Sequence, residues 1–308
     1  MILCCGEALI DMIPEPTVSG GSGFVTHSGG AVHNTAVALG RHGQSVGILT
    51  GLSTDMFGRQ LRAGLNASNV DCAHVINSDR PTTLAFVQLQ QGHASYSFFD
   101  ENSAGRMVAP QDMPPLGDDI EALFFGGISL ACEPGATAYA ALLDREGATR
   151  AVMIDPNIRT GFIEDTARYR ARLNRMIGAA DIVKVSDEDL DWIVEGPLSL
   201  PQKARALLEM GPALVILTQG REGATGFLPG GAEISVASQQ VDIVDTVGAG
   251  DSFNAGVLAN LSRQNLLSKD RLAALSPRAV QDALQYGAMV AAVTVSRAGA
   301  NAPWANEL

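Results

Sequence analysis

VDTVGAGDSFNAGVLANL, residues 244–261, is the stretch that decides the fold. An apolar segment runs into a Gly-Ala-Gly turn, and helix-forming residues follow at once. This order predicts a turn and a helix whose first backbone N–H groups have no partner inside the helix. Because the helix dipole adds partial positive charge at that end, the turn is predicted to bind an anion such as phosphate. The amides concerned belong to Gly248, Ala249, Gly250 and Asp251.

Outside this stretch, short apolar runs alternate with segments rich in Ala, Leu and Arg. The runs are nearly continuous, as expected of strands buried on both faces of a parallel sheet. Predicted strands cover residues 2–5, 46–50, 122–127, 151–155, 181–186 and 213–218. Predicted helices cover residues 31–43, 56–68, 135–147 and 166–178. The alternation predicts an α/β fold, a doubly wound and mostly parallel sheet with helices on both faces.

One region breaks the alternation. Between Cys72 and Phe99 apolar and polar residues take turns, and QQGH at 90–93 fits a hairpin turn. This pattern predicts antiparallel strands with Tyr96, Phe98 and Phe99 packed among them. We expect a small β lid, formed by about residues 12–28 and 72–105, over the ligand crevice of one domain spanning 1–308.

Composition limits the function. The chain has 308 residues, with 21 Lys and Arg against 33 Asp and Glu, a net charge of −12 that argues against nucleic acid or anionic lipid as partner. The apolar share of 46% and charged share of 18% match a globular protein. Four cysteines lack the spacing of a disulfide scaffold or zinc site. With no signal-peptide pattern or membrane span, a cytoplasmic protein is predicted.

The segment DTVGAGDSFNAG, residues 245–256, resembles the C-terminal signature of the ribokinase-like (phosphofructokinase-B type) carbohydrate kinases. Other motifs of that family follow in the expected order: GEALIDM (6–12), SGGAVHNTAVALGRHG (28–43), GLSTDMFGR (51–59), DPNIR (155–159), KVSDEDL (184–190), TQGREG (218–223) and SRAGANAP (296–303). The resemblance spans essentially the whole chain. It implies a ribokinase-like fold and a kinase that uses ATP and Mg²⁺ to phosphorylate a small sugar.

For catalysis, the resemblance implies that Asp251 removes the proton from the attacking sugar hydroxyl. A carboxylate beside a bound phosphate can do this. Arg159 of DPNIR, together with the amides of 248–251, would stabilise charge on the transferring phosphoryl group. On spacing alone, Asp251 could instead be a helix N-cap and Arg159 a partner in a surface ion pair.

Sugar binding is implied for residues that follow predicted strands. Asp11 comes just after the first strand, at the sheet edge where ligands bind in open α/β folds. Gly29 and Gly30 bring bare backbone, and Asn34 an amide, to the start of a helix. Asn157 emerges at the same edge. Without the resemblance, a solvated loop charge at Asp11 and a plain turn at the glycines would be favoured.

Nucleotide and metal roles are implied for the later motifs. The nucleotide contacts would be Lys184, Ser186, Thr218, Gly220, Gly223 and Asn301. The family more often has Asn and Glu where this chain has Ser186 and Asp189. Asp189 could organise Mg²⁺ through water, or its acidic neighbourhood could simply favour a helix start. Backbone carbonyls near Asp245 could hold a monovalent cation, K⁺.

The segments 6–12 and 101–107 look most like those of bacterial fructokinases. Ketodeoxygluconate kinase, ribokinase and nucleoside kinase are alternatives, and an acidic sugar would need an extra cation, for which Arg106 is the nearby candidate. A dinucleotide-binding oxidoreductase is disfavoured because no G-x-G-x-x-G follows the first strand. A silent sugar-binding regulator is disfavoured by the intact Asp251 motif. An exposed lid face predicts a homodimer.

Overall fold

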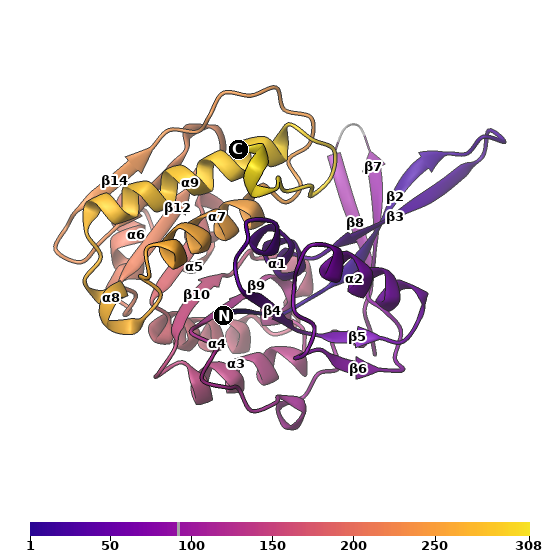
Figure 1. Ribbon diagram of the computed structural model, residues 1–308, viewed down its shortest axis with the longest axis horizontal. Coiled ribbons are helices and arrows are strands. Elements are labelled where there is room, and N and C mark those ends of the chain that lie inside the picture. The colour runs from indigo at the N-terminus through magenta and orange to yellow at the C-terminus, as the bar shows by residue number, and fades with distance from the viewer. Residues whose placement is uncertain (91–92) are drawn as a thin grey trace.

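A computed structural model describes residues 1–90 and 93–308 (Figure 1). Its main sheet has eight strands in the order β14-β13-β12-β11-β10-β9-β1-β4. The parallel strands are β1 (Ile2–Cys5), β4 (Val46–Leu49), β9 (Ala122–Gly126), β10 (Ala151–Asp155), β11 (Ile182–Ser186) and β12 (Leu214–Thr218). The predicted doubly wound, mostly parallel sheet is therefore confirmed. Two antiparallel strands that were not predicted, β13 (Ala224–Phe227) and β14 (Glu233–Val236), extend one edge.

Helices cover both faces of this sheet, as predicted. One face carries α1 (Ala31–Arg41), α2 (Met56–Ala67), α7 (Ala249–Arg263), α8 (Lys269–Ala273) and α9 (Pro277–Val295). The other carries α3 (Gly135–Glu146), α4 (Thr166–Ala179), α5 (Asp187–Ile193) and α6 (Leu200–Leu208). Side chains of β1 alternate between the two cores, Ile2 and Cys4 in one and Leu3 and Cys5 in the other. This explains why the strand is apolar throughout.

A second sheet stands out from the side of the core (Figure 1). It consists of β2 (Leu9–Pro16), β3 (Ser22–Gly29), β7 (Leu84–Gln90) and β8 (His93–Phe99), in the order β3-β2-β7-β8. Its hairpins are antiparallel, while β2 and β7 pair in parallel. The lid was predicted to cover about residues 12–28 and 72–105. In the structure its first half begins at Leu9 and its second half begins at Leu84. The turn residues 91–92 and the side chain of Tyr96 lie outside the described residues.

The segment expected to open the second half of the lid belongs elsewhere. β6 (Ile76–Ser78) pairs in parallel with β5 (Gly51–Ser53) as a separate two-stranded sheet. Short 3₁₀ helices complete the structure: η1 (Pro110–Asp112), η2 (Gly127–Leu130), η3 (Thr160–Phe162), η4 (Gly220–Glu222) and η5 (Ala305–Glu307). Among the described helices, none has both the length and the apolar character needed to cross a bilayer.

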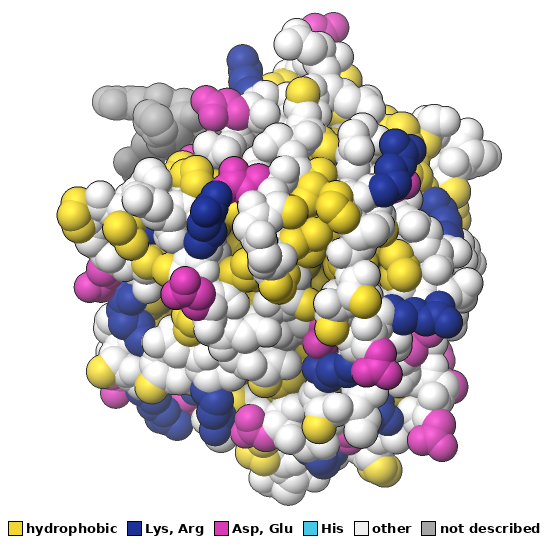
Figure 2. Space-filling model, turned by 90° about the vertical axis from the view of Figure 1, so that its left-hand side faces the viewer, with side chains coloured by type: hydrophobic (Ala, Val, Ile, Leu, Met, Phe, Trp, Pro, Cys, Tyr) yellow, Lys and Arg dark blue, Asp and Glu magenta, His cyan; other side chains and the backbone are white. Residues whose placement is uncertain are grey.

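The face on the left of Figure 1 is drawn in Figure 2. Hydrophobic side chains gather there in a depression, and basic side chains are interspersed with acidic ones around it. On the face drawn, Lys and Arg form no continuous basic surface of the kind that binds nucleic acid.

Candidate active site

Asp251 lies in the first turn of α7, and its side chain meets α1. Gly248 caps the helix with a left-handed φ of 77°. The Nδ2 group of Asn34 donates a hydrogen bond to Oδ2 of Asp251 at 2.9 Å. The Thr35 hydroxyl donates to the backbone carbonyl of Asp251 at 3.3 Å. The fold thus brings together the residues predicted as base and as sugar ligand, which are 217 positions apart in sequence.

The environment of Asp251 favours proton transfer near neutral pH. Its side chain is buried, and this burial raises its pKa to about 7. The hydrogen bond from Asn34 opposes the rise, as does the charge of Lys184, while Asp155 and Glu7 add to it. A carboxylate whose pKa lies near the working pH is well matched to general base catalysis.

Bare amides stand beside this carboxylate. The backbone N–H groups of Gly248, Gly250 and Asp251 meet no acceptor among the described residues. Ala249 differs from the expectation, because its N–H donates to the carbonyl of Thr246 at 3.3 Å. The turn also requires glycine, since a Cβ on Gly248 would lie 2.6 Å from that of Ala300. The anion-binding turn therefore offers the amides on either side of Ala249.

A buried charged cluster lies behind the turn. Nζ of Lys184 is 3.0 Å from Oδ2 of Asp155, and the same oxygen accepts a 2.6 Å hydrogen bond from Asn254. All three side chains are buried. Oδ1 of Asp155 and Oδ1 of Asn254 have no partner among the described residues. Sequence reasoning assigned Lys184 to the nucleotide but did not select Asp155 or Asn254.

Three of the predicted sugar residues, Asp11, Gly29 and Gly30, lie where the second sheet joins the core. Asp11 on β2 faces Gly29 on β3, where a Cβ would lie only 2.1 Å from Oδ2 of Asp11. Burial raises the pKa of Asp11 to about 6. Gly30 has a φ of 101°, and a Cβ there would lie 3.1 Å from Glu7. Both glycines are therefore required by their neighbours, and Gly29 leaves the space in which Asp11 sits.

Glu7 anchors the start of α1 and was missed by the sequence reasoning. Its carboxylate accepts hydrogen bonds from the Ala31 N–H at 3.1 Å and the Ser129 hydroxyl at 2.7 Å. Burial raises the pKa of Glu7, and those hydrogen bonds oppose the rise. Glu7 stands in the GEALIDM motif quoted for the resemblance, so the signal was present but only Asp11 was taken from it.

Within the DPNIR loop, Asn157 and Arg159 make no hydrogen bond or ion pair with Asp251. Asn157 has a left-handed φ of 42°. Arg159 is exposed, and its guanidinium donates to the backbone carbonyls of Ile158 and Asn157 at 3.1 and 3.5 Å. It forms no ion pair with a described residue, so the surface ion pair is absent, and it makes no hydrogen bond to Asp251. Its catalytic role remains a prediction.

Asp189 fastens this loop from α5. Its Oδ1 accepts a 2.9 Å hydrogen bond from the Ile158 N–H, and its own N–H donates to the hydroxyl of Ser186, the N-cap. Burial raises the pKa of Asp189, and the charge of Asp155 adds to the rise. Ser186 thus starts a helix, while Asp189 sits at the edge of the charged cluster, with its carboxylate bonded to the Ile158 N–H.

The predicted nucleotide loops lie along the same edge. The Thr218 hydroxyl donates to the carbonyl of Val185 at 3.3 Å. A Cβ on Gly220, which has a φ of 53°, would meet open space. Gly223 packs on the end of β14, where a Cβ would lie 2.1 Å from the carbonyl oxygen of Val236. In the C-terminal segment, the Asn301 side chain accepts a 2.8 Å hydrogen bond from Arg41.

Asp245 joins two loops beside the turn. One oxygen of its carboxylate accepts the Val247 N–H at 3.0 Å, and the other accepts the Gly299 N–H at 2.9 Å. This carboxylate therefore fixes the loop that precedes α7 against the segment that follows α9.

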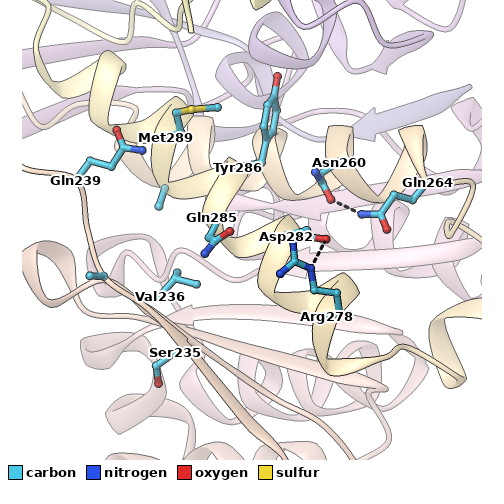
Figure 3. A pocket seen from close by; sticks show the side chains of 12 residues that line it. Ser235, Val236, Gln239, Asn260, Gln264, Arg278, Asp282, Gln285, Tyr286 and Met289 are labelled. Carbon is cyan, nitrogen blue, oxygen red and sulfur yellow. Dashed lines mark hydrogen bonds and ion pairs between the residues drawn. The ribbon is translucent and has the colours of Figure 1, made fainter.

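A groove of about 940 Å³ lies between α9, the end of α7 and residues 235–239 (Figure 3). Its lining is mostly uncharged, apart from the pair formed by Arg278 and Asp282. The backbone that packs on Gly223 forms one rim of this groove. The predicted nucleotide loop and the groove are therefore contiguous.

Comparisons with known proteins identify the family of the chain. Residues 1–307 match the pfkB family carbohydrate kinases. The chain belongs to the pfkB family of carbohydrate kinases. It is 50% identical over 283 residues to a fructokinase of Rhizobium leguminosarum bv. trifolii, covering 92% of this chain and 86% of the relative. A Klebsiella pneumoniae fructokinase is 33% identical over 276 residues, covering 88% of this chain and 87% of the relative.

Solved structures give the same answer for the fold. Fructokinase of Xylella fastidiosa with bound ATP superposes with a TM-score of 0.88 at 27% identity, covering 97% of this chain and 93% of that one. A fructokinase double mutant of Vibrio cholerae O395 with fructose, ADP and potassium ion gives 0.84 at 27% identity, with the same coverage. The ribokinase-like fold is confirmed. This pfkB carbohydrate kinase is an ATP-dependent sugar phosphotransferase, which excludes the oxidoreductase alternative.

The structure also shows what holds Arg106, the candidate cation for an acidic sugar. Arg106 donates to the carbonyl of Glu133 at 3.0 Å and pairs with Asp100 at 3.2 Å and Glu164 at 2.7 Å. Each part of its guanidinium is thus engaged by the protein itself. Arg106 leaves no uncompensated charge for an acidic sugar.

Proposed function

We propose that this pfkB carbohydrate kinase transfers the γ-phosphoryl group of ATP to a hydroxyl of fructose. The observation that carries the proposal is the meeting of Asp251, Asn34 and the free amides of the Gly248–Asp251 turn. A base and an anion site side by side are what phosphoryl transfer to an alcohol requires. The relatives named above are called fructokinases.

In this proposal Asp251 accepts the hydroxyl proton as the oxygen attacks the phosphorus. The neighbouring amides and Arg159 stabilise the negative charge of the transferring group. Asp11, Asn34, Asn157 and the backbone of Gly29 and Gly30 hold the sugar. The second sheet covers the site and excludes water.

A neutral sugar fits this site better than an acidic one. Arg106 is compensated by Asp100 and Glu164, so a sugar carboxylate would meet these acidic groups without a free cation. Asp11 is itself a hydroxyl acceptor when ionised. These contacts favour fructose over ketodeoxygluconate.

The nucleotide is proposed to extend from the turn past Gly220 and Gly223 into the groove in Figure 3, whose mostly uncharged lining suits a nucleoside. Lys184, Ser186, Thr218 and Asn301 would border its path. In the proposed complex, Mg²⁺ neutralises the nucleotide phosphates. Asp189 would act on the metal through water, because its carboxylate already accepts the Ile158 N–H and holds that loop.

A monovalent cation is proposed beside the loops that Asp245 fastens together. Both carboxylate oxygens of Asp245 accept hydrogen bonds from backbone N–H groups, those of Val247 and Gly299. Its role would be to hold the two loops whose carbonyl groups would bind the cation. The Vibrio cholerae relative is a potassium ion bound form. A rise in kcat when Na⁺ is replaced by K⁺ would support this site.

A homodimer through the second sheet is also proposed, because the sheet leaves Phe24 and Phe99 exposed. The predicted cytoplasmic location stays a prediction.

The test of the substrate is a coupled ADP-release assay across fructose, ribose, ketodeoxygluconate, glucose and nucleosides. We expect kcat/KM to be highest for fructose and the product to be a sugar phosphate. Higher kcat/KM for another substrate would overturn the fructose assignment. Binding of fructose without turnover would contradict the fructose assignment as well.

A further inference from the structure

Lys184 is the basic side chain that the described fold buries within the acidic cluster at the sheet edge. It projects from β11 and is 6% exposed. Asp155 on β10 holds its ammonium at 3.0 Å and also accepts the hydrogen bond from Asn254 on α7. The carboxylate of Asp155 therefore ties the ammonium to the helix that carries Asp251.

This ammonium lies against the anion-binding turn. A Cβ on Gly250 would lie 3.2 Å from Nζ of Lys184, so the ammonium occupies the side of the turn where a larger residue would project. The amides of Gly250 and Asp251 meet no described acceptor. Positive charge and bare amides thus adjoin at a single residue.

We propose that Lys184 is a positioning residue that places a buried positive charge behind the phosphate-binding turn at residues 248–251. This inference rests on the proposed binding of the transferred phosphate at that turn. Without the ammonium, the carboxylates of Asp155, Asp189 and Asp251 would face an incoming polyphosphate with no internal cation to offset them. Lys184 strengthens the anion site and keeps Asp251 ionised, so that both the binding of phosphate and the removal of the proton remain possible.

Stability alone does not require this pair. Replacing a buried ion pair by uncharged residues of similar volume is often neutral, whereas removing one partner is strongly destabilising. A variant that removes both charges therefore separates the two roles. It should fold normally if the pair only packs the interior, and it should also turn over normally unless the positive charge is used.

The experiment compares the full chain with K184M, K184M/D155N and K203M, using ADP release with fructose and thermal unfolding. K203M is the matched control, because Lys203 on α6 is also buried and pairs with Asp191 at 2.9 Å. We expect K184M/D155N to keep the wild-type Tm and KM for fructose, while kcat falls on the order of 10²-fold, as on removal of a preorganised donor. K203M should keep the wild-type kcat.

The pH profile supplies a second readout. The polar and charged groups that face Asp251 come from every neighbouring element: Glu7, Asn34, Thr35, Asp155 and Lys184. K184M alone should move the acid limb of kcat/KM to higher pH, because it leaves the negative charge of Asp155 beside Asp251. In K184M/D155N the limb should return toward the wild-type position while kcat stays low.

A wild-type kcat for K184M/D155N would overturn the inference, and so would an equal loss in K203M. If the double variant does not fold, K184Q carries the test, because its amide still donates to Asp155 without a charge. Inactivity of the wild-type protein with fructose would contradict the proposed substrate instead. The same comparison would then be made with the sugar that the wild-type protein phosphorylates.

Discussion

Side chains usually bury apolar groups and expose charges, and two regions of this molecule break that rule in opposite ways. One is the carboxyl edge of the eight-stranded sheet, and the other is the outer four-stranded sheet. At the edge, Asp155, Lys184 and Asp251 are charged and buried. In the outer sheet, Phe24 and Phe99 are apolar and exposed, at 48% and 58%. Buried charges destabilise a fold unless they are paired, and exposed aromatic clusters mark surfaces that become covered. The comparison teaches that one region is organised for a charged ligand and the other for an apolar surface.

The strongest way to break this comparison is to remove the charge of Asp251. Asp251→Asn keeps the shape but cannot accept the hydroxyl proton. We expect kcat to fall by about 10²–10⁴-fold, the range of general base catalysis, with the KM for fructose largely kept. Steady-state ADP release measures this. Near-normal kcat in the variant would contradict the assignment of the base.

The same variant should be more stable than the wild type at high pH. Burial raises the pKa of Asp251 from 3.8 to about 7, so folding favours the protonated form. That favourable contribution is complete below 3.8 and is lost as pH rises through about 7. Ionised Asp251 should therefore lower the free energy of unfolding at pH 8 by a few kcal/mol, on the order of three pKa units. Thermal unfolding at pH 5 and pH 8 should show a larger Tm advantage of D251N at pH 8, because at pH 5 the folded wild type still holds Asp251 protonated and only part of the contribution has been lost.

Much of the fold could be predicted from the sequence because its parallel strands are buried on both faces. The run at residues 2–5 is apolar throughout, and the structure places its side chains alternately in two cores. The edge strands β13 and β14 were not predicted, because both are short and Gly226 interrupts the apolar pattern of β13. Residues 76–78 were assigned to the lid because their pattern is that of any exposed strand, and pairing partners are not encoded locally.

Site residues could be predicted from the sequence only where the local motif itself indicates their role. Asp251, the glycines of its turn and Asn34 were named from local sequence, and the fold brings them together. Asp155, Asn254 and Glu7 were missed because their roles depend on partners 24 to 122 positions away in the sequence. All three stand in motifs quoted for the resemblance, but the spacing within a motif does not show which residue of another element its side chain will meet. Arg159 shows the reverse: its motif is local, but its guanidinium contacts only backbone carbonyls of its own loop.

A second prediction of large effect concerns the junction of the two regions. Gly29→Ala would place a Cβ 2.1 Å from Oδ2 of Asp11, so that side chain must move. We expect the KM for fructose to rise about 10–100-fold, because losing a hydrogen bond to a charged group in a buried site costs about 1.5–3 kcal/mol. Gly64→Ala is the matched control on α2, since its nearest neighbour to a new Cβ is 3.9 Å away. An unchanged KM in Gly29→Ala would exclude Asp11 from sugar binding.

The pH dependence of kcat/KM tests the buried carboxylate at the edge of the eight-stranded sheet. The base must be ionised, and burial raises the pKa of Asp251 to about 7. Below that value kcat/KM should fall about tenfold per pH unit, since protonation removes the acceptor. Asp11, whose pKa burial raises to about 6, should steepen the fall below pH 6. Activity that stays constant from pH 8 to pH 5 would show that neither carboxylate is required in its ionised form.

The smallest effect on turnover is expected on the apolar side of the comparison. Phe24 and Phe99 flank Phe86. The ring centroid of Phe86 lies 5.0 Å from that of Phe24 and 5.3 Å from that of Phe99, so the three rings form one partly exposed face. Phe24→Ser with Phe99→Ser should convert a dimer to a monomer in sedimentation equilibrium, because polar side chains weaken an apolar interface. The kcat should change less than about threefold, because surface substitutions usually change free energies by only about 0.5 kcal/mol. Val18→Ser, on the fully exposed turn between β2 and β3, should leave the molecular mass unchanged. A wild-type protein that sediments as a monomer at assay concentration would show that this aromatic face does not pair with a second copy.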